Sequence, residues 1–247
     1  MDMRHELSPA SLAKLVSFLF WSGLYVWSTV RWPKNSPEWS SRLVTLLHGS
    51  VATIAGLSQC GVTSLSAKSP HHYALMVWSW GYFAFDFLWC LVYWTENRLM
   101  LCHHLSALIA IMIYMQKEYT GCTFACTLAM MEVTNPLLQM RWFLRSAGYD
   151  KNLVFYLVEL TYLTLFLFVR GILGSYVIYK IVKSDFFDMD EKAISVVFYF
   201  VSLAFIYEIM GYIVHRYENR ISIKNKLLIN IYLKIIMLIL LFIVFTF

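Results

Sequence analysis

Two adjacent histidines, His103 and His104, stand in the stretch CHHLSALI, inside an apolar run with no other ionisable group except a thiol. An imidazole changes charge near neutral pH, so it can serve as a general acid or base. Because an ionisable side chain is costly in a hydrocarbon environment, its presence there indicates a function unless it serves helix packing. These two histidines are therefore the first candidates for chemistry.

A polar stripe formed by Glu132, Asn135 and Gln139 is the second candidate. Their spacing of i, i+3 and i+7 places the three side chains on one face of a helix. Pro136 lies within the stripe, removes a backbone donor and predicts a kink. A histidine that faces a carboxylate at the same depth is the arrangement that general acid–base catalysis needs. We therefore expect Glu132 to orient one of the two histidines.

Only one member of the histidine pair is expected to face this stripe, because neighbouring residues on a helix point about 100° apart. Three further polar residues, His48, Asp86 and Arg170, lie within other apolar segments. Together with Asn135 and Gln139, they are candidates to bind a lipid or another substrate. As alternatives, His48 could serve helix packing, and Asp86 and Arg170 could form a buried ion pair.

The elements that carry these residues are predicted to be membrane-spanning helices. The chain of 247 residues is 60% apolar and 14% charged, whereas soluble domains are about half apolar and a quarter charged. Apolar segments near the roughly 20 residues that cross a bilayer occur at 12–30, 43–65, 74–94, 99–116, 121–140, 153–179, 194–214 and 227–247. The predicted fold class is an all-α polytopic membrane protein, in which the eighth segment is either a span or a tail along the bundle.

The basic residues orient this bundle. The net charge of +5 is spread over the joints, which disfavours nucleic acid as a partner. Most Lys and Arg residues lie in joints after odd-numbered segments, so these joints are predicted to be cytosolic and the N-terminus lumenal or extracellular. At 1.5 Å per residue, His48, His103, Glu132 and Asn135 lie about 7–13 Å from those basic residues. This shared depth predicts a polar chamber that opens toward the cytosol.

Other residue patterns predict little chemistry. The five cysteines form neither CxxC nor zinc-finger spacings, so we expect no disulfide framework and no structural zinc site. Only one histidine pair, His103 and His104, lies within the predicted spans, which is too few for a diiron membrane hydroxylase. We expect neither a metal nor a cofactor. The aromatic residues between Trp78 and Trp89 are expected to face lipid or the interface, and His71 and His72 to be solvated.

Three stretches make the sequence resemble the TLC-domain superfamily, the membrane fold of ceramide synthases and of several small proteins. They are RLVTLLHGSVATIAG (Arg42–Gly56), HHLSALI (His103–Ile109) and MEVTNPLLQMRWFLR (Met131–Arg145). The resemblance covers about residues 40–215, and the third stretch is similar to the small non-synthase branch. It implies a barrel-like bundle of six helices, formed by the second to seventh spans, with the first span outside.

In ceramide synthases the corresponding region begins HHxxT and continues to an HDxxD element, and both are implicated in acyl transfer from acyl-CoA to a sphingoid amine. The histidine pair matches the first element. In the second element, Met131 replaces the His, Glu132 the first Asp and Asn135 the second. The paired carboxylates are thus reduced to one, since a neutral Asn cannot accept a proton as a base.

Together these observations predict three segments: an N-terminal segment with the first span at 1–39, a TLC domain at 40–215, and a basic joint with an apolar tail at 216–247. The expected function is that of an integral protein of lipid homeostasis that binds a lipid or acyl chain in the chamber. Its expected partners are membrane lipids and further protein subunits in a homo- or hetero-oligomer.

The alternative function is acyl transfer, with His103 or His104 as base, Glu132 as orienting residue and acyl-CoA as co-substrate. A lipid transporter ranks last, because the chain has one Pro-broken helix and no internal repeat. The endoplasmic reticulum or another endomembrane is the expected compartment, with the plasma membrane as the alternative.

Overall fold

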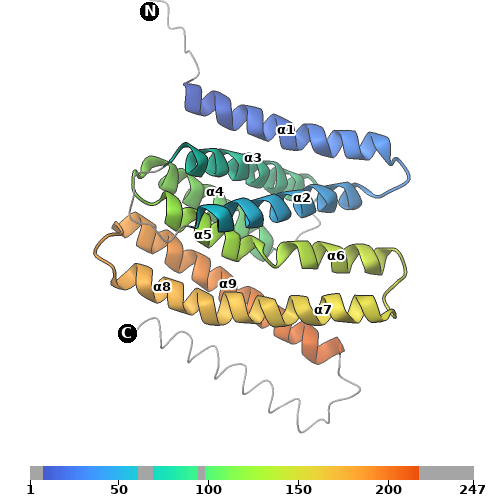
Figure 1. Cartoon of the computed structure of the whole chain (residues 1–247). Helices are drawn as coiled ribbons and strands as arrows, with labels where there is room; N and C mark the ends of the chain where they lie inside the picture. Colours follow the sequence, from blue (N-terminus) through green and yellow to red (C-terminus); the bar gives the residue numbers. More distant parts are fainter. Residues whose placement is uncertain (1–7, 61–68, 94–97, 217–247) are drawn as a thin grey trace, which may run out of the picture. The chain divides into compact units, whose positions relative to one another are not determined.

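The computed structural model describes residues 8–60, 69–93 and 98–216, and every secondary-structure element in these ranges is a helix (Figure 1). The elements are α1 (Pro9–Arg31), α2 (Pro37–Gln59), α3 (Pro70–Tyr93), α4 (Arg98–Gln116), α5 (Gly121–Glu132), α6 (Asn135–Ser146), α7 (Leu153–Phe166), the π-helix η1 (Leu167–Leu173), α8 (Gly174–Lys183) and α9 (Met189–Arg216). The all-α fold class is confirmed. The predicted eighth segment, 227–247, lies outside the described residues.

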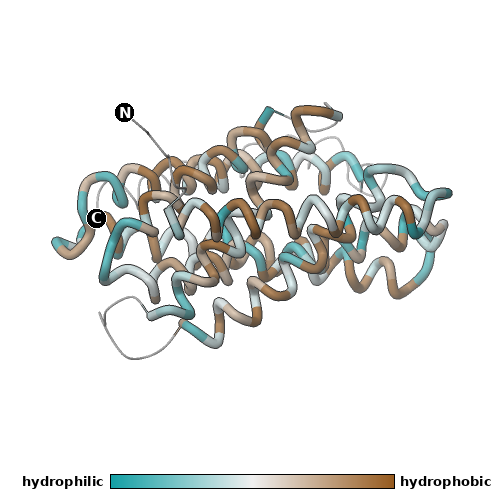
Figure 2. Tube along the Cα trace, turned by 90° about the horizontal axis from the view of Figure 1, so that it is seen from above, coloured by the Kyte–Doolittle hydropathy of each residue, from teal (hydrophilic) through white to brown (hydrophobic). Residues whose placement is uncertain are grey.

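Five helical stretches of the described residues are long and apolar enough to cross a membrane: α1, α3, α4, the continuous run α7–η1–α8, and α9. Hydrophilic residues are concentrated at helix ends and turns, and hydrophobic residues along most of the helix lengths (Figure 2). The chain is an integral multi-pass membrane protein.

Two predicted spans differ from the observed helices. The helix α2 runs from Pro37 to Gln59 instead of 43–65, because Ser36 caps it by accepting a hydrogen bond from the Trp39 amide and Pro37 suits its first turn. The segment 121–140 is divided into α5 and α6, with Pro136 in the first turn of α6. The kink that Pro136 predicts is therefore confirmed.

The chain divides into two compact units, Met1–Glu159 and Leu160–Phe247. In the first unit α3 packs against α1, α2 and α4, and α2 also packs against α5 and α6. In the second unit α8 and η1 both pack against α9. Arg170 lies in η1, with its Nη1 atom 3.5 Å from the hydroxyl of Ser202 and its guanidinium 5.3 Å from the ring centre of Phe166.

The contact between α2 and α5 is made by small residues. A Cβ atom at Gly56 would lie 2.7 Å from the carbonyl oxygen of Ala125 and 2.9 Å from the Cβ of Ala129. Gly49 and Ala52 lie on the same face of α2 and are also buried. Small residues let membrane helices approach closely, so van der Waals contact can hold them together.

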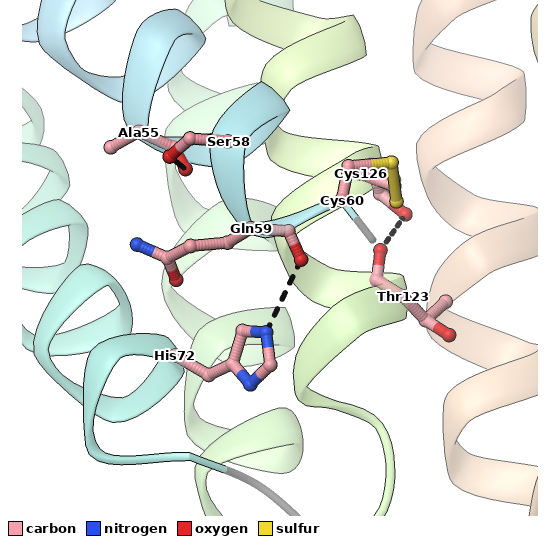
Figure 3. The surroundings of a disulfide bond; sticks show 8 residues. Ala55, Ser58, Gln59, Cys60, His72, Thr123 and Cys126 are labelled. Carbon is pink, nitrogen blue, oxygen red and sulfur yellow. Dashed lines mark hydrogen bonds between the residues drawn. A yellow bond between two sulfur atoms is a disulfide. The ribbon is translucent and has the colours of Figure 1, made fainter. Parts of the chain in front are cut away.

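A disulfide bond between Cys60 and Cys126 joins the end of α2 to α5 (Figure 3). The sequence expectation of no disulfide framework is corrected here. It rested on the lack of closely spaced cysteine pairs, whereas these two residues are 66 positions apart in the sequence. They meet only because α2 packs along α5.

The aromatic residues of α3 are mostly inside the protein, so the prediction that they face lipid is wrong for four of them. Tyr82, Phe83, Phe85 and Trp89 are only 2–6% exposed. The reason is the central position of α3, which packs against four other helices of its unit, α1, α2, α4 and α5. His72, expected to be solvated, is also buried; its ring contacts Ser69 and the Gln59 carbonyl (Figure 3).

Candidate functional site

A buried polar cluster fills the space between α2, α3, α4, α5 and α6 in the first unit. It combines acidic, imidazole, amide, thiol and hydroxyl side chains with one guanidinium. Its members are Ser41, Arg42, Thr45, His48, Ser79, Tyr82, Asp86, Cys90, His104, Glu132, Asn135 and Gln139. Such groups lie between apolar helices only where they satisfy one another or serve a ligand.

The predicted stripe across α5 and α6 is observed as a chain of hydrogen bonds. The Asn135 amide donates to Glu132 Oε2 over 2.9 Å, and the Gln139 amide donates to Asn135 Oδ1 over 2.9 Å. Arg42 of α2 extends the chain, because its Nη1 atom donates to Gln139 Oε1 over 3.2 Å. Arg42 also pairs with Glu38 one turn earlier on α2. The buried Glu132 is therefore linked by amides to a basic residue.

One imidazole that lies beside Glu132 is that of His48 of α2, which the sequence did not pair with this carboxylate. Its Nδ1 atom lies 3.8 Å from Glu132 Oε2, and its Nε2 atom lies 3.4 Å from the hydroxyl of Ser79. The ring stacks on Tyr82 with centroids 3.8 Å apart and an interplanar angle of 6°. Gly49 makes room for this pair, since a Cβ there would lie 3.3 Å from Glu132 Oε2.

The partner of His104 is Asp86 of α3. The His104 Nε2 atom lies 3.1 Å from Asp86 Oδ2, yet neither ring nitrogen makes a hydrogen bond to a described residue. The Asp86 carboxylate also accepts hydrogen bonds from the Ser41 hydroxyl, at 3.5 Å from Oδ1, and from the Tyr82 hydroxyl, at 3.4 Å from Oδ2. Both members of the pair are buried, with exposed fractions of 7% for Asp86 and 3% for His104.

His103 and His104 point in different directions, as their adjacency on a helix predicts. His104 is buried, whereas His103 is half-buried, with its ring centre 5.5 Å from that of His104 and 6.3 Å from that of Phe83. The two histidines therefore have different environments: His104 lies beside Asp86, and His103 is close enough to Glu132 for an electrostatic interaction.

Elsewhere in the first unit, the buried Glu159 accepts a hydrogen bond from Arg141 Nε over 2.9 Å. Arg170 belongs to the second unit, where its contacts are Ser202 and Phe166. The sequence reading missed Cys90, whose sulfur lies within 4.8 Å of ligand-type atoms of Asp86 and His104. The signal was present in the sequence, because Asp86 and Cys90 are four residues apart and share a helix face.

No solved structure matches this chain. A family model described as the TLC domain matches residues 38–247. The match contains all three stretches on which the resemblance was based, and it also includes residues 216–247, which were assigned to a separate tail. The division into three segments stays a prediction. A match over this much of the sequence establishes that the chain belongs to the TLC-domain family.

Proposed function

We propose that this TLC-domain protein acts in lipid homeostasis by binding a lipid or acyl chain beside the buried polar cluster. Family membership supports a role in lipid metabolism or homeostasis. One observation carries the proposal: two carboxylates and two imidazoles, those of Asp86, Glu132, His48 and His104, are buried together between apolar helices. Such a costly arrangement suits the polar end of a molecule whose remainder is apolar.

Glu132 and Asn135 offer the best residues for a direct test of lipid binding. Native mass spectrometry of the purified full chain should find a co-purified lipid. Glu132→Gln combined with Asn135→Leu should weaken its binding by on the order of tenfold, equivalent to about 1.4 kcal/mol. The control is Leu105→Ala, which alters an exposed apolar residue of α4. Equal lipid occupancy in both variants would contradict the proposal.

Cells that lack the protein should show a changed lipid composition that the wild-type chain restores. If the protein only binds lipid and does not catalyse, His103→Ala combined with His104→Ala should still restore the composition in part, because His48, Asp86 and Glu132 remain, provided that the variant folds. Failure of this folded variant to restore the composition favours the catalytic alternative.

The acyltransferase alternative is supported by the proximity of His104 Nε2 to Asp86 Oδ2, 3.1 Å apart. A carboxylate beside an imidazole strengthens it as a base. In this reaction His104 or His103 accepts the proton of a lipid amine or hydroxyl, whose N or O atom attacks the thioester carbonyl of acyl-CoA. The C–S bond breaks, and the coenzyme A thiolate leaves and takes up the proton. Asp86 replaces Glu132 as the orienting residue for His104.

Turnover of acyl-CoA with lipid amines and alcohols tests this alternative. His103→Ala with His104→Ala should abolish turnover, and Asp86→Asn should lower it by about 10²–10⁴-fold, the usual contribution of general acid–base catalysis. Unchanged turnover in the double variant would exclude the mechanism.

Within the family, we infer that the chain belongs to the small non-synthase branch. The stretch EVTNPLLQMRWFL is similar to that of TLC domain-containing protein 5, also called transmembrane protein 136. The single carboxylate of this stretch, Glu132, supports the inference, because the synthase element has paired carboxylates.

We further propose that the N-terminus and the disulfide end of α2 face the lumen or the exterior. The positive-inside rule favours this orientation, and so does the Cys60–Cys126 bond, because disulfides form in oxidising compartments. An endomembrane such as the endoplasmic reticulum is the proposed location. Membrane-impermeant thiol labelling should modify reduced Cys60 only from the lumenal side; cytosolic labelling would reverse the orientation.

A further inference from the structure

We propose that Asp86, Cys90 and His104 form a binding site for one Zn²⁺ ion. The fourth coordination position is left for water or for an oxygen atom of a lipid. This site goes beyond lipid binding and beyond the expectation of no metal that the cysteine and histidine spacings gave. Carboxylate oxygen, thiolate sulfur and imidazole nitrogen are all ligands of zinc, and three protein ligands plus one open position are typical of its catalytic sites.

The separation of the ligand atoms fits this assignment. Zinc binds nitrogen and oxygen at about 2.0–2.2 Å and sulfur at about 2.3 Å, so ligand atoms around a tetrahedral ion lie about 3.3–3.7 Å apart. Asp86 Oδ2 and His104 Nε2 are 3.1 Å apart, and all three ligand atoms lie within 4.8 Å of one another. The longest separation would have to shorten by about 1 Å when the ion binds.

The direction of the His104 ring is the second observation. At 3.1 Å an imidazole and a carboxylate ordinarily share a hydrogen bond, but His104 Nε2 makes none with Asp86 or with any other described residue. Two ligand atoms that are close together without pointing at each other are arranged as neighbours around a third atom. This is the relation between two ligands of one metal ion.

The helices supply a fixed frame for the site. Asp86 and Cys90 are one turn apart on α3, and His104 lies on α4, which packs against α3. Cys90 is about 5 Å from the end of α3 and His104 about 9 Å from the start of α4. Both ligands are thus near the ends of their helices, where an ion can enter from the aqueous side.

Charge balance favours a divalent cation at this position. Among the described residues of the first unit, Asp86 is contacted by two hydroxyls and by His104, and by no lysine or arginine. A carboxylate and a thiolate together neutralise Zn²⁺, and the neutral imidazole adds no charge, so the occupied site carries none into the membrane interior. The hydroxyls of Ser41 and Tyr82 hold the carboxylate in place, as outer partners of metal ligands do.

Metal analysis of the purified full chain, with any histidine tag removed, tests the proposal. We expect about one zinc per chain in the wild type and a loss of about 10–100-fold in zinc affinity for Cys90→Ser and for His104→Gln. Cys102→Ser is the matched control, because Cys102 lies on α4 but is exposed. Asp188→Asn with Asp190→Asn controls for metal held by the exposed acidic residues at the start of α9.

Cobalt substitution of the wild type provides a readout that does not depend on how a variant folds. Co²⁺ bound in the wild type should give a thiolate charge-transfer band in the near ultraviolet, and this band should be absent from Cys90→Ser. A wild type that binds no zinc when it is supplied, or a cobalt spectrum without the thiolate band, would overturn the site.

The zinc proposal and the lipid proposal can be tested independently of each other. Glu132→Gln with Asn135→Leu should reduce lipid binding and leave the zinc content near one per chain, whereas Cys90→Ser should remove the metal. Bound zinc would also occupy His104 Nε2, the atom that faces the orienting Asp86 in the acyl-transfer alternative. Zinc that is lost equally from Cys90→Ser and Cys102→Ser would contradict the site.

Discussion

Different interactions hold the helices of the first unit together at the two ends of α2. At one end of α2, small residues contact α5 and a disulfide connects Cys60 to Cys126. At the other end, Ser41 and Arg42 reach Asp86 and Gln139 through hydrogen bonds. The first end is uncharged and held by close contact and a covalent bond, whereas the second contains ionisable groups. We infer that the first end fixes the distances between helices, and that the second uses those distances for binding.

Removal of the disulfide should have the largest effect on stability. Cys60→Ser with Cys126→Ser removes a link between residues 66 positions apart, and we expect a loss of about 2–4 kcal/mol in the free energy of unfolding. Thermal unfolding in detergent without reductant measures it. Exposed Cys102 provides the control as Cys102→Ser. Equal unfolding temperatures for the two variants would show that the disulfide does not fix this end.

Gly56→Ala should have an intermediate effect at the same end. The added methyl group would lie 2.7 Å from the Ala125 carbonyl oxygen, so α2 or α5 must shift, and we expect a loss of about 1–3 kcal/mol. Gly23→Ala is the control, because nothing lies within 4 Å of the new methyl group and the helix propensity of alanine should add stability. The same unfolding assay compares them, and a stabilised Gly56→Ala would mean that this contact is not tight.

Arg42→Lys should have the smallest effect on stability, at the polar end. Lysine keeps the charge but loses the planar guanidinium, which contacts Gln139 and lies 4.8 Å from the ring of Trp142. We expect a loss of about 1 kcal/mol, the usual net value of one hydrogen bond. Arg145→Lys, at an exposed position of α6, is the control. If Arg42→Lys lowers the free energy of unfolding more than Cys60→Ser with Cys126→Ser does, the proposed division between the two ends is wrong.

Periodicity in the sequence predicted the local features of the site well. The spacing of Glu132, Asn135 and Gln139 gave their shared face, and Pro136 marked the break between α5 and α6. Both depend on residues that are close in the sequence: the helical repeat sets the shared face, and the missing N–H group of proline sets the break.

The pairing between helices could not be read from the sequence in the same way. Glu132 meets His48, and Asp86 meets His104, although the sequence offered all four as candidates without pairing them in this way. Which pairs form depends on the rotation of each helix about its axis and on which helices are neighbours. The buried aromatic residues of α3 were misassigned for the same reason, because an apolar residue suits lipid and protein interior equally well.

The π-helix η1 holds extra chain length between α7 and α8. Its i→i+5 hydrogen bonds hold one residue more per bonded turn than an α-helix does, and Arg170 lies within its seven residues. Because these wider turns absorb the extra length, Ile178 and Ile181 of α8 still face the interior of the second unit. Deleting one residue between Leu167 and Leu173 would convert the π-helix to an α-helix and leave the buried face of α8 nearly unchanged. A single-residue deletion within α8 would instead turn the residues after it by about 100°.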